Sequence, residues 1–123
     1  DTRGQFVYSF HVQPDGSLSH RQRYFHLRIA DGDTDSGADG MTVDVQGRLY
    51  VATRLGIQIC DQAGRVIGII PKPHRAWLSN VCFGGADFSD LYISIGDKVF
   101  KRKTKTSGAL TFNDPIKPAA PRL

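Results

Sequence analysis

Short segments in which hydrophobic and polar residues alternate fill most of the chain, separated by turn residues. The pattern is clearest in residues 38–53, where a first strand (41–45), a tight turn (46–47) and a second strand (48–53) follow one another. Alternation with a period of two is typical of a strand in a half-buried sheet. The sequence therefore predicts an antiparallel pair here, with one face toward the core.

The chain upstream of this pair predicts a hairpin. Residues 5–12 and 21–29 both alternate in strand fashion, and a Pro-Asp-Gly-Ser turn signal at 14–17 separates them. The acidic, glycine-rich stretch 31–37 has a faint likeness to a calcium loop, but the glutamate at the twelfth position and the flanking helices are missing. We expect that stretch to be a solvated connection.

Downstream, further strands are expected at 56–60 and 65–70, before Pro71 and Pro73 end the run because proline cannot donate to a sheet ladder. Residues 41–70 should thus form a meander of four short antiparallel strands.

The pattern then restarts. Leu-Tyr-Val at 49–51 recurs as Leu-Tyr-Ile 42 positions later, at 91–93, and the same offset carries Ile57 onto Val99. Such a period with four short strands per unit is typical of β-propeller blades. We therefore predict an all-β fold of antiparallel four-stranded meanders, about two blades of a propeller. The chain is expected to be a single partial propeller domain over 1–123, with the end of a blade at 1–30, a full blade at 38–72, most of a blade at 79–106 and a tail at 107–123.

A propeller needs at least about four blades to close. This sequence cannot close one alone, so it should leave sheet edges exposed, and exposed edges favour strand-to-strand association. We expect self-association through these edges.

Composition narrows the classes of partner. The formal net charge of +4 is mild and lies largely in Lys101, Arg102, Lys103 and Lys105, without a basic patch interleaved with aromatic residues, so no nucleic-acid partner is expected. No apolar run approaches the roughly 20 residues of a spanning helix, so no membrane partner is expected either. The first residue is not Met and no signal peptide is recognisable, which suggests a mature product or a piece of something longer.

The two cysteines, Cys60 and Cys82, fall in apolar strands and show no metal-ligand spacing, so both are predicted to be buried free thiols.

Candidate chemistry centres on Asp39, directly ahead of the first strand of the meander. It is followed by Gly40, which allows close approach of the backbone. A carboxylate at a strand mouth can serve as a ligand, although a loop aspartate can instead bond its own backbone in an Asx turn.

Trp77 could stack on a sugar or lactone ring if exposed, or cap the core if buried, and we expect the second. Surface or structural roles are expected for the four histidines, which are not spaced as a triad requires: His11, His20, His26 and His74.

Two ordered motifs carry a family resemblance. Asp-Gly-Met-Thr-Val-Asp at 39–44 precedes Gly-Arg-Leu-Tyr-Val-Ala at 47–52, and Asn-Val-Cys-Phe-Gly-Gly at 80–85 precedes the second Leu-Tyr-Ile. From about Phe6 to Phe100 the chain resembles the C-terminal third or so of the regucalcin / gluconolactonase / luciferin-regenerating-enzyme family. Those proteins are six-bladed propellers with one divalent metal at the mouth of the central channel, so the resemblance implies that fold.

The resemblance also implies a site. In that family the aspartate of the Asp-Gly motif is a metal ligand and the proposed general base, and here it corresponds to Asp39. The other ligands, a glutamate and an asparagine from other blades, have no counterpart in this sequence. Asn80 does not occupy a ligand position and should instead satisfy backbone at a strand start. Because Ca2+ takes about six to eight oxygen ligands, binding of a divalent metal (Ca2+ or Zn2+) should be weak or absent in this chain alone. A ring of copies, each contributing one Asp39, is the alternative.

By resemblance, the chain is expected to be part of a metal-dependent sugar-lactone hydrolase, inactive alone, with a sugar lactone as the parent protein's substrate and Asp39 as ligand and base. The competing hypothesis is a non-enzymatic propeller-like scaffold or interaction module in which Asp39 only holds a turn.

Overall fold

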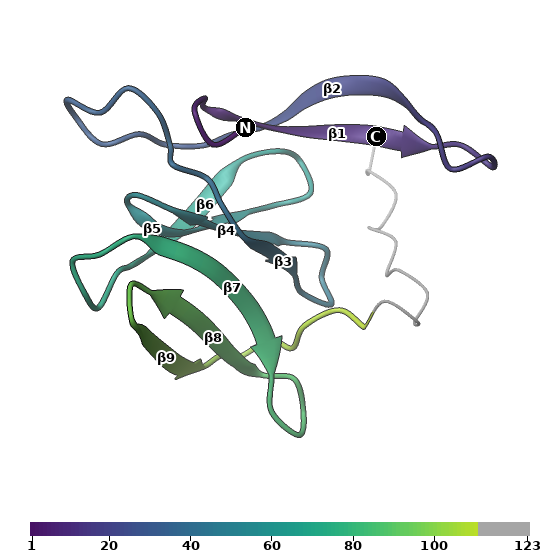
Figure 1. Ribbon diagram of the computed structural model, residues 1–123. Coiled ribbons are helices and arrows are strands. Elements are labelled where there is room, and N and C mark those ends of the chain that lie inside the picture. The colour runs from purple at the N-terminus through teal and green to yellow at the C-terminus, as the bar shows by residue number, and fades with distance from the viewer. Residues whose placement is uncertain (111–123) are drawn as a thin grey trace, which may run out of the picture.

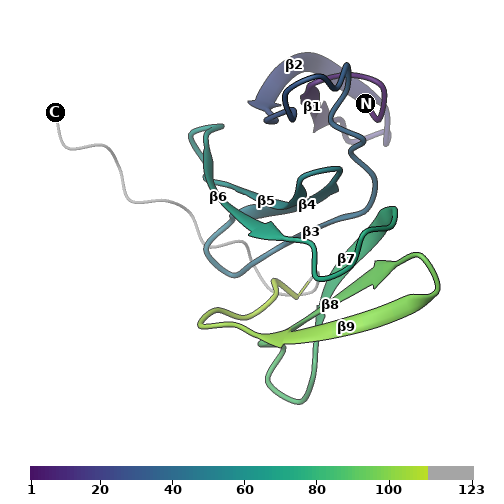
Figure 2. The ribbon, with the colours of Figure 1, turned by 90° about the vertical axis from the view of Figure 1, so that its left-hand side faces the viewer.

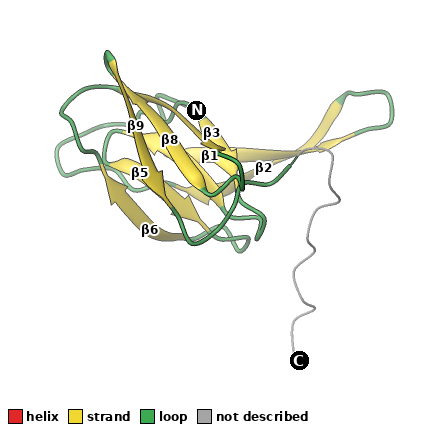
Figure 3. Cartoon of the chain, turned by 90° about the horizontal axis from the view of Figure 1, so that it is seen from below, coloured by secondary structure: helices red, strands yellow, loops and turns green. Residues whose placement is uncertain are grey.

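Within residues 1–110, the part of the chain described in this computed structural model, nine strands form three antiparallel sheets (Figure 1). The strands are β1 (Phe6–Val12) and β2 (Leu18–His26) in a hairpin; β3 (Met41–Val43), β4 (Leu49–Thr53), β5 (Gly56–Cys60) and β6 (Val66–Pro71) in a four-stranded meander; and β7 (Leu78–Gly84), β8 (Asp90–Ile95) and β9 (Lys98–Lys103) in a three-stranded meander. The described residues contain no helix (Figure 3), and hence none long and apolar enough to cross a membrane.

The three sheets lie one beneath another, hairpin first and three-stranded sheet last, in the order of the chain (Figure 2). This arrangement confirms the predicted all-β fold of antiparallel meanders and is that of a partial β-propeller. After β9 the chain returns to the first strand of the middle sheet, where Ser107 and Ala109 bond the backbone of Val45 and Val43 at 2.9 Å each. The rest of the predicted tail, residues 111–123, lies outside the described residues.

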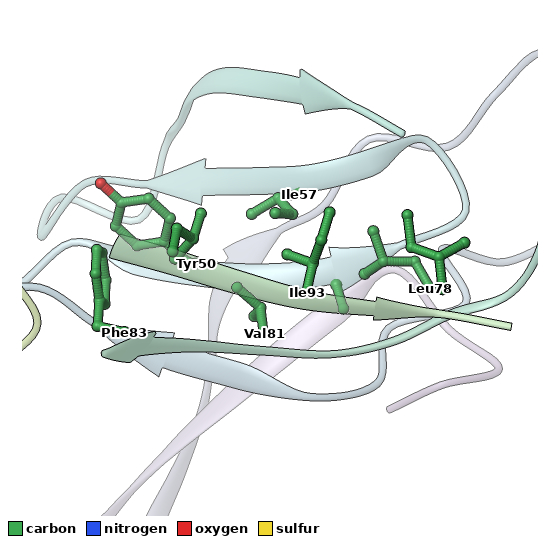
Figure 4. Packing of buried hydrophobic residues seen from close by; sticks show 9 residues of the cluster. Tyr50, Ile57, Leu78, Val81, Phe83 and Ile93 are labelled. Carbon is green, nitrogen blue, oxygen red and sulfur yellow. The ribbon is translucent and has the colours of Figure 1, made fainter. Parts of the chain in front are cut away.

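Strand β4 is buried on both faces, where alternation predicts burial on one. Leu49 and Val51 pack under the hairpin, in a cluster completed by Val7, Phe25, Leu27, Ala38 and Cys60. Tyr50 and Ala52 point the other way, toward the three-stranded sheet, and the ring of Tyr50 meets that of Phe83 edge-on at 5.1 Å (Figure 4). The prediction of a half-buried strand is wrong because the middle sheet has a neighbour on each side.

The 42-residue repeat is also a repeat of packing direction. Leu49 packs toward the hairpin, and Leu91, its equivalent in β8, packs toward the middle sheet, so each faces the sheet that precedes it in the chain. Ile57 packs toward the sheet that follows it, whereas its equivalent Val99 is 72% exposed. Equivalent residues therefore keep their orientation from one sheet to the next, as stacked blades require.

A fully buried glutamine ties the hairpin to the middle sheet. The side chain of Gln58 accepts a hydrogen bond from the backbone N–H of Arg28 at 2.8 Å and donates to the carbonyl of the same residue at 2.7 Å. A further bond to Thr53 Oγ1, at 3.2 Å, completes the amide's partners. A buried polar group without hydrogen-bond partners costs free energy of folding. The three hydrogen bonds of Gln58 therefore explain why an amide is tolerated between two apolar layers.

Two local expectations from the sequence are wrong. Cys82 is exposed, because it lies on the face of β7 that points away from the middle sheet, while Cys60 is buried as predicted. The connection at 31–37 is solvated only as far as residue 34. Asp35 and Ser36 are buried, since Ser36 bonds the carbonyl of Gly4 through both its Oγ and its backbone N–H.

Candidate functional site

Asp39 lies directly ahead of β3, the first strand in the order of the middle sheet. Its backbone N–H donates to the carbonyl of Ala52 at 3.0 Å, and the N–H of Ala52 donates to the carbonyl of Gly40 at 2.9 Å. These bonds extend the β3–β4 ladder and fix the backbone at the end of the strand. The structure thus places Asp39 at a strand mouth, with its side chain exposed.

Gly40 allows the three-stranded sheet to approach this point. Its N–H donates to the carbonyl of Ser79 at 2.9 Å, and a Cβ at this position would lie only 2.8 Å from the Cα of Asn80. Any larger residue would therefore clash with backbone. The Oδ1 of Asn80 accepts from the N–H of Val81 at 2.8 Å, so this side chain satisfies backbone as expected, although β7 already begins at Leu78.

The carboxylate of Asp39 is held by an indole. Nε1 of Trp77 donates to Oδ2 of Asp39 at 2.9 Å, while Oδ1 makes no hydrogen bond with any described residue. The Asx-turn alternative is not observed, because no backbone N–H of residues 1–110 donates to this carboxylate. Trp77 is 41% exposed, so the expectation of a buried tryptophan is also wrong.

A second layer of side chains supports the indole. The guanidinium of Arg54 lies 5.3 Å from the centre of the Trp77 ring, and its Nε donates to Oδ1 of Asp35 at 2.9 Å. The hydrogen bond from Arg54 is the main reason why the pKa of Asp35 is lowered. Gly37 completes the packing, since a Cβ there would lie 2.6 Å from the side chain of Arg54. Asp35, Arg54, Trp77 and Asp39 thus form one continuous set of contacts.

Sequence reasoning missed Asp35 and Arg54 as members of the site. One signal was available in the Asp-Ser-Gly triplet at 35–37, a typical Asx turn, in which the N–H of Gly37 donates to Oδ1 of Asp35 at 2.9 Å. No local sequence pattern indicates that this turn pairs with Arg54.

A pocket of about 390 Å³ adjoins Trp77. It is formed by the β4–β5 turn, the β6–β7 connection and the exposed part of the loop before β3. The residues that line it are Asp33, Thr53, Arg54, Lys72, Arg75, Ala76, Trp77 and Leu78.

The described residues do not by themselves fit a tightly bound divalent metal. Among residues 1–110 no three His, Cys, Asp or Glu side chains come together in a way that could hold an ion. Asp39 offers a single carboxylate, whereas Ca2+ takes about six to eight oxygens.

The contacts of the histidines are with groups other than Asp39. The rings of His11 and His20 are 5.0 Å apart on the hairpin, and the ring of His26 stacks on Phe6 at 4.8 Å. Nδ1 of His20 lies 2.9 Å from Oγ of its neighbour Ser19, but no carboxylate of the described residues hydrogen bonds to that ring. A catalytic triad is therefore not formed in this part of the chain.

Comparison with known proteins decides the family. The model of the SMP-30/Gluconolactonase/LRE-like region matches residues 1–96. This chain belongs to that family. The family resemblance seen in the two sequence motifs is confirmed.

Among curated members of the SMP-30/gluconolactonase family, regucalcin from Danio rerio is 34% identical over 82 residues, which cover 64% of this chain and 26% of that protein. A gluconolactonase from Zymomonas mobilis is 39% identical over 88 residues, covering 72% of this chain and 23% of that protein. The chain thus spans about a quarter of the length of these relatives.

Solved structures agree on the fold. A luciferin-regenerating enzyme superposes with a TM-score of 0.71 at 20% identity, covering 89% of this chain and 41% of that one. A gluconolactonase from Xanthomonas campestris superposes with a TM-score of 0.55 at 27% identity, covering 78% and 28%.

Proposed function

We propose that these blades supply Asp39 to a metal-dependent hydrolase of sugar lactones, within a ring that contains further blades. Membership of a family that includes gluconolactonases supports this function. The observation that carries it is the carboxylate of Asp39, which is exposed at the mouth of β3 and oriented through one oxygen by Trp77, with the other oxygen unbonded among the described residues. That arrangement suits a group that must accept a proton.

In the proposed reaction, the oxygen of a water molecule bonds to the lactone carbonyl carbon, the ring C–O bond breaks, and a hydroxy acid results. Asp39 acts as the general base: it takes the proton of the attacking water at Oδ1 and returns a proton to the ring oxygen as the C–O bond breaks. A divalent metal such as Ca2+ or Zn2+ would be held by Asp39 together with ligands from other blades, and it would polarise the carbonyl. The hydrogen bond from Trp77 fixes the carboxylate so that Oδ1 faces the water.

The ring is proposed to be completed by strands outside the described sheets. Sheets of two, four and three strands stacked in one direction leave edges without partners in residues 1–110. We propose that this chain self-associates through such edges when no further blades cover them.

The experiment is hydrolysis of an aldonolactone, followed by pH-stat, with the complete natural chain that contains these residues. Hydrolysis should require Ca2+ or Zn2+ and fall when a chelator is added. Asp39→Asn should lower kcat by about a hundredfold or more, the usual contribution of a general base. Asp61→Asn, which changes a partly exposed turn carboxylate outside the site, should leave kcat unchanged. Absence of metal-dependent hydrolysis, or full activity in Asp39→Asn, would contradict the proposal and favour a scaffold role.

A further inference from the structure

The pocket beside Trp77 has the size and lining of a small-molecule site. Its volume of about 390 Å³ falls in the range of roughly 300–1,000 Å³ that such sites occupy. It shares Trp77 with the carboxylate of Asp39, which itself does not line the pocket.

The charge of the lining favours an anion. The lining contains three cationic side chains, those of Arg54, Lys72 and Arg75, and one carboxylate, that of Asp33. Arg54 is already paired with Asp35, so the cations left for a ligand are those of the β6–β7 connection. Among residues 1–110, Nζ of Lys72 donates only to a neutral carbonyl, that of Ala76 at 3.1 Å.

Arg75 is exposed and makes no ion pair with any residue of the described part of the chain. Its guanidinium can therefore form paired hydrogen bonds to a carboxylate without first losing another partner.

The wall of the pocket adds a preference for a ring. Trp77 remains 41% exposed although Arg54 lies over it, and an indole offers a broad apolar surface beside polar groups. A ligand with one apolar ring face and several hydroxyls would use both kinds of surface, because the carboxylate of Asp33 can bond its hydroxyls.

We propose that this pocket binds a sugar acid, with its carboxylate on Lys72 and Arg75 and its hydroxylated carbon skeleton against Trp77. The identification of the ligand class rests on the proposed function, since opening a sugar lactone produces a hydroxy acid of this kind. The pocket and the proposed base then have Trp77 in common.

Trp77 is the chain's sole tryptophan, so its fluorescence reports directly on the pocket. The 123-residue chain is titrated with sodium gluconate, with sorbitol as the uncharged analogue and with sodium chloride at matched ionic strength. Gluconate should change the emission saturably, whereas sorbitol and chloride should not. Arg75→Gln should raise the apparent Kd roughly tenfold, the effect of losing one charged hydrogen bond.

Lys72→Gln should weaken binding to a similar extent, while Lys98→Gln, a charge change on the exposed strand β9, should leave the Kd unchanged. Thermal melts identify variants that fold as the wild type does. An equal response to sorbitol, no saturable response to gluconate, or an unaltered Kd in Arg75→Gln would overturn the inference. The titration needs neither metal nor turnover. If gluconate does not bind but lactone hydrolysis is intact, only the proposal for the pocket is overturned. If gluconate binds but no hydrolysis is observed, only the proposed function is overturned.

Discussion

Nε1 of Trp77 and Oδ2 of Asp39 are joined by a 2.9 Å hydrogen bond between residues 38 positions apart. The bond links the β6–β7 connection to the start of β3, so the orientation of the carboxylate depends on the packing of two sheets. Arg54 over the indole and Asp35 behind Arg54 extend this dependence to the loop before β3. The proposed base is therefore positioned by contacts between sheets as well as by its own strand.

Replacement of Trp77 by phenylalanine should lower catalysis without unfolding the protein. Phenylalanine keeps an aromatic ring in this half-exposed position but cannot donate a hydrogen bond to Asp39. We expect kcat for lactone hydrolysis by the complete natural chain to fall roughly tenfold, the equivalent of one hydrogen bond to a charged group. The melting temperature should change little. An unchanged kcat in Trp77→Phe would show that the bond does not position the base.

The same turn is built twice in the middle sheet, once with a buried carboxylate and once with a partly exposed one. In each copy an aspartate Oδ1 accepts backbone N–H bonds from residues two and four positions later, and Oδ2 accepts from the Nε of the arginine four positions later. The copies are Asp44 with Arg48 and Asp61 with Arg65. The side chain of Asp44 is fully buried and also accepts from Tyr50, whereas that of Asp61 is 18% exposed.

Asp44→Asn should therefore destabilise the fold far more than Asp61→Asn. An amide in place of the buried carboxylate leaves the charge of Arg48 without its partner and removes an acceptor from Tyr50, at a cost of about 3 kcal/mol. A loss of about 10 °C in melting temperature is expected. In Asp61→Asn, water can replace the lost bonds and the shift should be much smaller. Equal shifts in melting temperature in the two variants would mean that burial does not determine how much this turn contributes to stability.

Local chemistry was enough to predict the strands, and the differences at their ends have physical causes. The first strand of the middle sheet is predicted over 41–45, but β3 ends at Val43 because the carboxylate of Asp44 accepts the backbone N–H groups of Gln46 and Arg48 in the turn that follows. The second strand of the hairpin is predicted over 21–29, but β2 ends at His26 because Arg28 bonds Gln58 of the neighbouring sheet instead.

The site was predictable only in part. Asp39 and Gly40 form a local motif, so the position of the carboxylate at a strand mouth could be read from the chain. Its partners could not, because Trp77 and Asp39 meet only once two sheets have packed, and Arg54 reaches Asp35 across 19 positions. Burial on both faces of β4 was missed for the same reason. Alternation of hydrophobic and polar residues indicates one buried face, but it does not indicate that another sheet packs on the other face.

Stability should fall in alkaline solution. Burial, with the negative charge of Asp61, raises the pKa of the Cys60 thiol to about 11, and burial, with Asp44, raises that of Tyr50 to about 12. In the unfolded chain these groups ionise near 9.0 and 10.0, so above about pH 9 the folded state binds more protons than the unfolded state. The free energy of unfolding therefore decreases from about pH 9 to pH 12.

Urea midpoints measured between pH 8 and pH 11 check this dependence. Tyr50→Phe should flatten the decline above about pH 10, and Cys60→Ala should flatten it between about pH 9 and 11, even though each variant is less stable at pH 8. An equally steep decline in both variants would show that other groups cause it.

Self-association should depend on the edge strand β6 rather than on β9. Strand β9 carries Lys98, Lys101, Arg102 and Lys103 along its length, and charged side chains on an edge oppose strand pairing. Strand β6 reads Val-Ile-Gly-Ile-Ile-Pro and exposes 54% of Ile67. In light scattering, the mass of the 123-residue chain should rise with concentration, and Ile67→Lys should suppress that rise. Val99→Lys, a change of the same kind on β9, should have little effect. A monomeric wild type at all concentrations, or equal suppression by both variants, would contradict association through β6.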